Sequence, residues 1–276
     1  AEKDILQHVN HPCLVSLHSA FSNKRKIYFI LELMRGGELY CHLGKVKRFT
    51  EPQTKFIIAC IVLALGHLHK HNYIYRDLKL ENILLNDKGY AKLTDFGLAK
   101  FVRREDRTQT ICGTIFYLAP EVLSADEGHS HPADWWSLGI LTYELLNGFP
   151  PFYSKNDKLL MKMIKSGEFN FYDKVPLTKE CKDFITKLLL KKQSQRLGSS
   201  KDMEEVKAHP WFNGFDWKAL ENMTAVAPYD PHVTDANWIH NFDEEFLNQD
   251  VRDSAVYEME KDNQAEIDDA FKGFED

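Results

Sequence analysis

The spacing of hydrophobic and polar residues predicts a short helix and a strand at the start of the chain. Within residues 1–10, Ile5, Leu6 and Val9 share one helical face, and Pro12 ends the pattern. Residues 26–33 are rich in β-branched and aromatic side chains, which predicts a strand that stops at the glycine pair 36–37.

A long helix is predicted from Thr50 onward. Thr50 and Gln53 have the spacing of a capping box, and Pro52 stands in the first turn, where its missing N–H has no helical partner. The following residues are apolar nearly all round the helix, which predicts burial in the core. The longest apolar run, residues 56–65, is too short to span a bilayer, so no membrane span is predicted.

Residues 82–94 predict a β-hairpin, with strands at 82–85 and 90–94 joined by a turn that ends in Gly89. Three further helices are predicted at 133–147, 155–166 and 178–192, and Gly148 supplies the stop signal of the first. A small strand-containing piece ahead of a helix-rich body indicates an α+β fold.

Composition changes this picture little, but charge and cysteine content add to it. Hydrophobic residues make up 43% and charged residues 28% of the chain, as in ordinary globular enzymes. Five cysteines without C-x-x-C spacing favour a reducing compartment, so we expect a cytoplasmic protein, with the nucleus as an alternative. Residues 241–276 carry a net charge of −10, which leaves +4 for the rest. This pattern indicates an acidic tail, and we expect no nucleic-acid partner.

Three short motifs stand in order between residues 75 and 121. They are Tyr75-Arg76-Asp77-Leu78-Lys79-Leu80-Glu81-Asn82, Asp95-Phe96-Gly97 and Ala119-Pro120-Glu121. They resemble the catalytic loop, the metal-binding turn and the end of the activation segment of eukaryotic protein kinases. Each motif alone is weak evidence, but the ordered set, separated by a predicted strand pair, indicates phosphoryl transfer.

The resemblance extends over essentially the whole chain and narrows to the AGC group of Ser/Thr kinases. Tyr75 at the start of the catalytic loop, residues 110–114 and residues 134–139 resemble the ribosomal-S6, Akt and cyclic-AMP-dependent types. The resemblance implies a kinase-like fold with a helix-rich C-lobe and a partial N-lobe of helix C and strands four and five only. It divides the chain into the partial N-lobe and hinge at 1–34, the C-lobe at 35–212, and a C-terminal extension with a hydrophobic motif at 213–276.

Half of the usual nucleotide clamp is missing from these 276 residues. No G-x-G-x-x-G loop and no V-A-I-K-type lysine precede Asp77, and the chain begins at Ala1 without a methionine. We therefore expect an N-terminally truncated fragment, nearly inactive by itself, of a longer active parent. A non-catalytic scaffold or pseudokinase is the alternative.

The resemblance implies ATP and Mg²⁺ as cofactors. It makes Asp77 the acceptor for the proton of the attacking hydroxyl and Lys79 a contact of the transferring phosphate. Asn82 and Asp95 supply the hard oxygen ligands that Mg²⁺ prefers. The implied nucleotide-site residues are Glu2 (the helix-C glutamate), Leu31 (the gatekeeper), Glu32 and Met34 (the hinge), Glu81, Leu84 (the floor) and Thr94. For Leu31 and Leu84, ordinary core packing remains open.

Regulation and tail docking are also implied by the resemblance. Thr110 is the expected phosphorylation site for an upstream activating kinase, with Arg76 and Lys100 as its cationic partners and Thr108 as the alternative acceptor. Residues 241–246 resemble the tail segment that crosses the nucleotide cleft, and Phe271 and Phe274 resemble the hydrophobic motif. Asp250 and Glu275 stand where many relatives carry an acceptor Ser or Thr.

Protein substrates are implied, with basic residues upstream of the target hydroxyl, because Glu38, Glu81 and Glu144 match positions that favour arginine. The position after the target would meet Ile111, Ile115 and Leu118, and Thr114 together with Lys79 indicates Ser/Thr specificity. Two departures, Ile115-Phe116 for the usual Pro-Glu and Leu80 for a frequent proline, leave this preference open.

Four further residues have implied structural or chemical roles. Asp134 would hydrogen-bond the catalytic-loop backbone or cap its own helix, and Arg196 would pair with Glu121. Cys112 is a redox-sensitive candidate, with a quiet thiol favoured. The histidines at 67, 69 and 71 and at 129 and 131 lack other ligands at metal-binding spacing, so no metal site is predicted there.

Overall fold

A computed structural model describes residues 2–22, 27–103, 105–110, 112–124, 128–172, 175–242 and 247–248. Several residues singled out in the sequence lie outside this part of the chain, namely Ile111, Asp250, Phe271, Phe274 and Glu275. The proposals made for them stay predictions.

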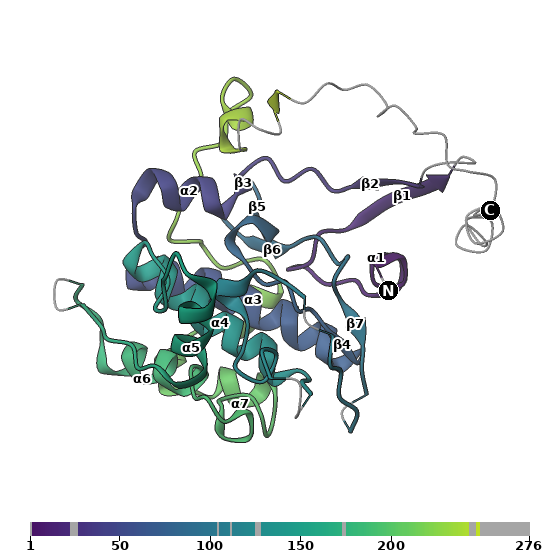
Figure 1. Ribbon diagram of the computed structural model, residues 1–276. Coiled ribbons are helices and arrows are strands. Elements are labelled where there is room, and N and C mark those ends of the chain that lie inside the picture. Colours follow the sequence, from purple (N-terminus) through teal and green to yellow (C-terminus); the bar gives the residue numbers. More distant parts are fainter. Residues whose placement is uncertain are drawn as a thin grey trace.

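A small strand-and-helix piece stands beside a larger helical body (Figure 1). Helix α1 (Glu2–His8) lies near a ribbon of β1 (Leu17–Ser22) and β2 (Ile27–Leu31). The two strands are antiparallel, with a register irregularity between Leu17 and Ser19. The α+β class, with a helix and two strands ahead of the helical body, is thus confirmed. The helix ends at His8, two residues before the end of the predicted range.

Helix α3 (Glu51–Lys70) forms the centre of the body, as the sequence predicted. The Thr50 hydroxyl accepts from the Gln53 N–H at 3.4 Å, and the Gln53 side chain accepts from the Thr50 N–H at 3.0 Å. Both bonds of the capping box are therefore present. Residues 56–65 are all buried, which agrees with their all-round apolar character.

The predicted hairpin is present but shorter at both strands. Strands β5 (Ile83–Leu85) and β6 (Ala91–Leu93) pair antiparallel, and β3 (Gly37–Glu38) pairs with β5 to complete a three-stranded sheet. Asn82 belongs to a 3₁₀ turn, η1 (Leu80–Asn82), instead of the strand. A further pair, β4 (Tyr73–Ile74) with β7 (Lys100–Phe101), was not predicted, because two-residue strands have no detectable periodicity.

The remaining helices surround α3. They are α2 (Leu39–Val46), α4 (Pro132–Asn147), α5 (Asp157–Ser166), α6 (Lys179–Leu188), α7 (Met203–Lys207) and α8 (Trp217–Glu221), with 3₁₀ turns η2 (Ile115–Tyr117), η3 (Gln193–Gln195), η4 (Pro210–Phe212) and η5 (Trp238–Asn241). Helix α4 ends as predicted, with Gly148 at φ 83°. Helix α6 ends four residues before the predicted boundary, and the Arg196 guanidinium donates to the carbonyl of Leu190, just beyond its end, at 3.2 Å.

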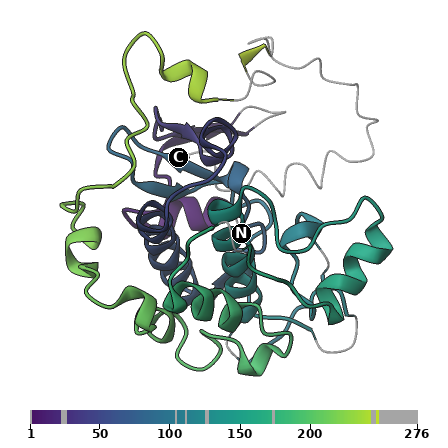
Figure 2. The ribbon, with the colours of Figure 1, turned by 90° about the vertical axis from the view of Figure 1, so that its left-hand side faces the viewer.

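The segment after α8 runs back along the body toward α2 (Figure 2). The Tyr90 hydroxyl donates to the carbonyl of Ala225 at 2.5 Å, and the Tyr229 hydroxyl lies 2.7 Å from His42 Nδ1. Further along, Lys45 Nζ donates to the carbonyl of His240 at 2.9 Å. The tail is thus fastened to the α2 side as far as η5.

A buried ion pair joins Glu121, at the end of the activation segment, to Arg196, as the resemblance implied. Arg196 donates to both carboxylate oxygens of Glu121, at 2.5 and 2.8 Å, and also to the carbonyl of Pro132 at 2.8 Å. Both side chains are almost fully buried.

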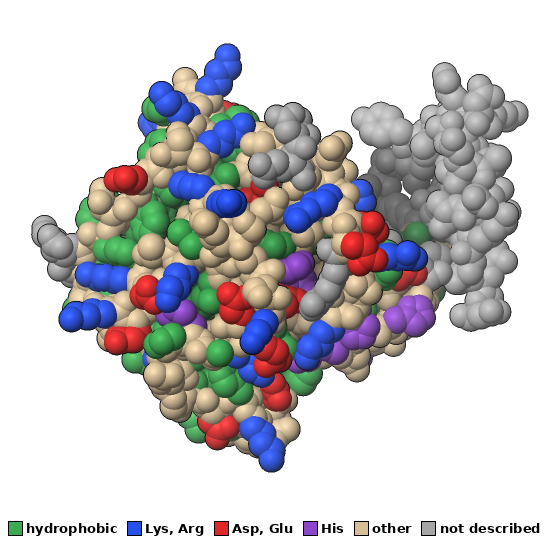
Figure 3. All heavy atoms as spheres, turned by 90° about the horizontal axis from the view of Figure 1, so that it is seen from below, with side chains coloured by type: hydrophobic (Ala, Val, Ile, Leu, Met, Phe, Trp, Pro, Cys, Tyr) green, Lys and Arg blue, Asp and Glu red, His purple; other side chains and the backbone are tan. Residues whose placement is uncertain are grey.

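On the face of the molecule seen from below, neither positive nor negative side chains predominate. Lys and Arg side chains are interspersed there with Asp, Glu and apolar groups (Figure 3). None of the helices in the described part of the chain is long and apolar enough to cross a membrane.

Arg196→Ala in the intact protein should lower the free energy of unfolding by about 3–5 kcal/mol, because it leaves the Glu121 carboxylate buried without its cation. The matched control is Glu221→Gln, which breaks the ion pair between Lys207 and Glu221. Because the Glu221 side chain is 45% exposed, this change should alter the free energy of unfolding by roughly 0–1 kcal/mol. Urea unfolding of both variants checks this. Equal losses would contradict the assigned importance of the buried pair.

Candidate active site

Asp134 holds the catalytic-loop backbone. This α4 carboxylate is 1% exposed and accepts from the N–H groups of Tyr75 and Arg76, each at 2.9 Å. Arg76 has φ 68°, an uncommon conformation for a residue other than glycine. Two hydrogen bonds to one buried carboxylate therefore fix the strained backbone just before Asp77. The hydrogen-bonding role expected for Asp134 is confirmed, whereas the N-cap residue of α4 is His131 and not Asp134.

Two side chains, those of Lys79 and Asn82, contact Asp77. Its Oδ2 accepts from Lys79 Nζ at 2.9 Å and from Asn82 Nδ2 at 2.9 Å, and its carbonyl accepts from the same amide at 3.0 Å. The η1 turn makes this possible, since it reverses the chain between Lys79 and Asn82. Asp77 is 6% exposed, so these contacts compensate a carboxylate largely removed from water.

Asp95 reaches the same region from the end of the hairpin. The N–H of Thr94 donates to the carbonyl of Asn82 at 3.1 Å, and the Tyr75 hydroxyl donates to the carbonyl of Thr94 at 2.5 Å. Burial, followed by the charges of Asp77 and Asp95, raises the pKa of the Tyr75 phenol well above its usual value. The structure therefore brings Asp77, Asn82 and Asp95 around one phenol.

The donor set fits a magnesium ion. Asn82 uses its amide nitrogen toward Asp77, which leaves its carbonyl oxygen as the group suited to a hard cation. Asp95 adds a carboxylate, with Oδ1 also accepting from the Gly97 N–H at 3.1 Å. Mg²⁺ is commonly held by one or two carboxylates with phosphates and water. Within the described ranges, no group of three or more His, Cys, Asp or Glu side chains is arranged to hold a metal.

Glu2 faces this region from α1. A Cβ built at Gly97 would lie 3.9 Å from its Oε2, and burial, followed by the charge of Asp95, raises the Glu2 pKa. Across the part of the chain that the structure describes, no basic side chain forms an ion pair with Glu2. The N-terminal ammonium opposes this shift and lowers the Glu2 pKa in part.

The other predicted nucleotide-site residues line the strands and the connection after β2. Leu31 ends β2 and is partly exposed, whereas Met34 is buried and its carbonyl accepts from the Gly37 N–H at 2.9 Å. The Glu32 carboxylate contacts Lys92 Nζ at 2.7 Å. Leu84, half-buried, lies opposite Glu38 in the sheet.

Two threonines of the activation segment differ in access. Thr108 is 4% exposed, accepts from Lys100 Nζ at 2.8 Å and pairs its backbone with His129. Thr110 is exposed. The structure thus directs Lys100 to Thr108, and leaves Thr110 as the more accessible of the two hydroxyls.

Arg76 lies between the catalytic loop and this segment. Its Nε donates to the carbonyl of Leu98 at 2.7 Å, while its buried Nη1 has no hydrogen-bond partner among the described residues. Burial, followed by the charge of Arg76, lowers the pKa of His129, and Lys100 adds to this effect. For Cys112, burial raises the thiol pKa, which favours the quiet thiol.

Glu144 and Glu81 lie close together, whereas Glu38 is buried on β3. The Tyr117 hydroxyl donates to Glu144 Oε2. Burial raises the Glu144 pKa to about 7, although the Tyr117 bond lowers it, and the charge of Glu81 raises it further. Ser137 Oγ donates to the Tyr117 carbonyl at 2.8 Å and so fixes η2. Thr114 directly precedes η2, and Ile115 is its first residue. Leu118 follows η2 and is buried.

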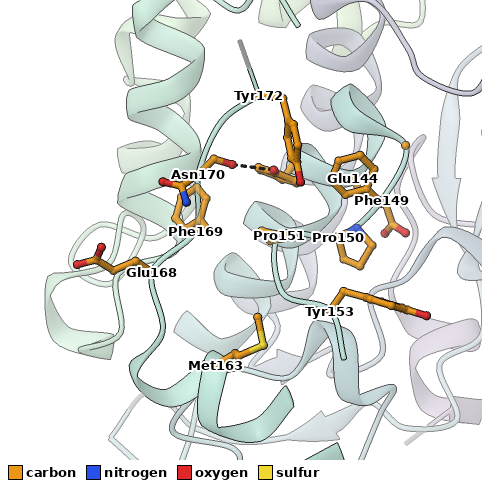
Figure 4. A pocket seen from close by; sticks show the side chains of 12 residues that line it. Glu144, Phe149, Pro150, Pro151, Tyr153, Met163, Glu168, Phe169, Asn170 and Tyr172 are labelled. Carbon is orange, nitrogen blue, oxygen red and sulfur yellow. Dashed lines mark hydrogen bonds between the residues drawn. The ribbon is translucent and has the colours of Figure 1, made fainter. Parts of the chain in front are cut away.

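A pocket of about 540 Å³ adjoins Glu144. Figure 4 shows Tyr172 at one end and Met163 at the other, with Phe149 and Tyr153 along the side. Sequence reasoning missed it, because its walls come from the end of α4, the loop between α4 and α5, α5 itself and the loop after α5. Sequence reasoning also missed His69, which contacts Asp134, and Asp202, which contacts His69. These contacts join residues that are far apart in the chain.

The comparisons with known proteins agree with this geometry. Residues 1–212 match the protein kinase domain and residues 234–275 match the protein kinase C terminal domain. Protein kinase 2 of Dictyostelium discoideum is 44% identical over 276 residues, which cover 99% of this chain and 56% of that protein.

Two further relatives are similarly close. Ribosomal protein S6 kinase 2 beta of Xenopus laevis is 42% identical over 92% of this chain and 40% of that protein. Serine/threonine-protein kinase sgk-1 of Caenorhabditis elegans is 42% identical over 93% of this chain and 55% of that protein. The chain belongs to the protein kinase family, and the C-terminal match with these relatives assigns it to the AGC group of Ser/Thr kinases. It spans about half the length of the curated relatives it matches.

Proposed function

We propose that the protein to which this chain belongs transfers the γ-phosphate of ATP to serine and threonine hydroxyls of other proteins. The observation that carries the proposal is the contact of Lys79 and Asn82 with Asp77, at 2.9 Å each, beside Asp95. Phosphoryl transfer depends on positioning and charge stabilisation, and this set supplies both.

The roles follow from the chemistry of each group. Asp77 orients the attacking hydroxyl and accepts its proton, because its buried carboxylate lies between the Lys79 ammonium and the Asn82 amide. Lys79, held by Asp77 before substrate binds, offers its ammonium group to the transferring phosphate. Protein kinases generally use ATP and Mg²⁺, and Asn82 and Asp95 would hold the metal, which neutralises charge on the phosphates when bound.

The nucleotide clamp is incomplete within these 276 residues, and Glu2 lacks a cation among the described residues. We infer that this stretch by itself binds nucleotide weakly and is nearly inactive. The same observation favours the second candidate, a non-catalytic scaffold. Asp77, Lys79, Asn82 and Asp95 weigh against it, because a scaffold requires none of them.

Asp77→Asn in the intact protein should lower kcat by roughly 10²–10⁴-fold while leaving ATP affinity nearly unchanged, because the acceptor carboxylate is lost and the adenine site is not. Steady-state kinetics with a peptide substrate and ATP binding by calorimetry test this. The control Asp87→Asn changes an exposed hairpin carboxylate and should behave as wild type. An Asp77→Asn enzyme within a few-fold of wild type would refute the assigned role.

We further propose that phosphorylation of Thr110 by an upstream kinase activates the enzyme. The exposed Thr110 hydroxyl and the buried Arg76 Nη1 without a partner among the described residues support this. A phosphate brings about −1.5 to −2 charge and would pair with Arg76 and Lys100. In the tail, Asp250 and Glu275 would supply fixed negative charge, so docking of Phe271 and Phe274 would need no phosphorylation.

Thr110→Ala should remove most activity of the intact protein, because Arg76 and Lys100 then face each other without a counter-charge. Thr108→Ser keeps the buried hydroxyl and serves as the control. Intact-mass measurement and peptide mapping before and after phosphatase treatment give the readout. Active enzyme without phosphate on Thr110, or activity that follows phosphate on the tail, would overturn the proposal.

Substrates with basic residues upstream of the target are supported by the acidic pair Glu81 and Glu144. Two carboxylates near each other attract a cation, and a bidentate arginine would satisfy both charge and hydrogen bonding. Glu38, on β3, would serve a separate basic position. The preference just after the target remains open at Ile111, Ile115 and Leu118.

The KM for an arginine-containing peptide should fall by about tenfold as pH rises from 6 to 8, because Glu144, with a pKa of about 7, ionises over this range. Tyr117→Phe removes a bond that favours the ionised form, so the transition should move to higher pH. Glu144→Gln and a peptide with alanine in place of arginine are the controls. The same pH dependence in Glu144→Gln would exclude Glu144 as its source.

A further inference from the structure

A continuous path of buried polar contacts leads from the start of α7 to the catalytic loop. Asp202 Oδ1 lies 2.8 Å from His69 Nδ1, and His69 Nε2 lies 2.8 Å from Asp134 Oδ2. Asp134 in turn accepts from the N–H groups of Tyr75 and Arg76. All three charged side chains of the path are almost fully buried, which makes each contact count more than it would in water.

His69 bridges two carboxylates with its two ring nitrogens. Only the imidazolium form can donate from both nitrogens, so two carboxylates at these distances favour a protonated ring. Burial lowers the His69 pKa, but the charges and hydrogen bonds of Asp202 and Asp134 outweigh this and raise it to about 9. The other groups around the ring are His131 and Trp135, at centroid distances of 5.6 and 5.2 Å, and Arg103 on the wall of a small adjoining cavity.

Asp202 departs from what its position predicts. It stands at the N-cap of α7, where aspartate normally accepts from its own helix, yet its side chain makes no such bond. Its backbone has φ 54° and ψ −136°, a conformation that favours glycine. The carboxylate instead accepts from Trp135 Nε1 at 2.9 Å and contacts His69. A strained backbone that aims a buried carboxylate at a relay points to function rather than to local stability.

Two glycines allow this segment to approach. A Cβ at Gly66 would lie 2.3 Å from Met203 Sδ, and one at Gly198 would lie 2.5 Å from Trp135 Cδ1. The chain around Asp202 is therefore seated directly on α3 and α4. Its carboxylate has little freedom to move away from His69.

We propose that Asp202, acting through His69 and Asp134, is a positioning residue that holds the catalytic-loop backbone for phosphoryl transfer. This role rests on the proposed kinase function. Asp202 keeps His69 charged and aligned, and His69 keeps Asp134 ionised and aimed at the two backbone N–H groups. Loss of the Asp202 carboxylate frees one ring nitrogen and loosens the loop before Asp77.

The experiment compares Asp202→Asn, Asp202→Gly and the control Asp216→Asn in the intact protein. Asparagine retains the shape of Asp202, and glycine relieves the backbone strain, so a folded variant is available either way. Asp216 is an exposed N-cap that accepts from the Ala219 N–H at 2.9 Å and has no link to the loop, and asparagine caps equally well. The readouts are kcat, the KM values for ATP and peptide, thermal stability, and hydrogen exchange of the peptide containing the Tyr75 and Arg76 amides.

Both Asp202 variants should lower kcat by about tenfold at pH 8, with KM values within about twofold, and should speed exchange of the loop amides. The loss in Asp202→Asn should be smaller at pH 6, where His69 stays protonated beside Asp134 alone. Asp216→Asn should match wild type in every readout.

A pH-independent loss that follows melting temperature, or wild-type exchange in both Asp202 variants, would overturn the proposal. If the wild-type protein transfers no phosphate, the kinase function fails, while faster exchange in the variants still supports the positioning role.

Discussion

The buried carboxylate of Asp134 is the contact on which the rest of the site depends. A carboxylate removed from water is costly unless its oxygens are fully used, and here they accept from two backbone N–H groups and face an imidazolium. Its geometry sets the left-handed conformation of Arg76, which directs Asp77 toward Lys79 and Asn82. A shift in the first turn of α4 would therefore be transmitted to the backbone of Tyr75 and Arg76 through these hydrogen bonds.

The helical body and the small piece made of α1, β1 and β2 contribute differently to the site. Helix α4 is almost wholly buried and α3 is buried along most of its length. The Arg196–Glu121 pair fastens the end of the activation segment to the start of α4, where Arg196 also donates to the Pro132 carbonyl. The β1–β2 ribbon, by contrast, exposes apolar side chains such as Phe21 and Ile30, and Glu2 has no cation among the described residues. The half of the site that holds Asp77 and Asn82 is thus the more deeply buried one.

Charge is arranged in opposite ways on the two sides of the catalytic loop. Toward the activation segment, Arg76 and Lys100 approach His129 and lower its pKa after burial, so this side favours an anion. Toward α4, Glu81 and Glu144 lie near each other, and burial raises the Glu144 pKa to about 7, so this side favours a cation. A regulatory phosphate and a basic substrate residue would therefore be drawn to different faces of the same loop.

Features encoded locally were determined by the sequence itself. The capping box of α3, the glycine stop of α4, the hairpin and the order of the three motifs could all be predicted, because each depends on residues within a few positions of one another. Helix α2, the β4–β7 pair, the early end of α6 and the raised pKa of Glu144 could not. The link from Asp202 to His69 spans 133 positions, and the pocket beside Glu144 is walled by residues distributed between Tyr143 and Tyr172. Only tertiary packing decides such contacts, because burial and distance between remote residues have no local signature in the chain.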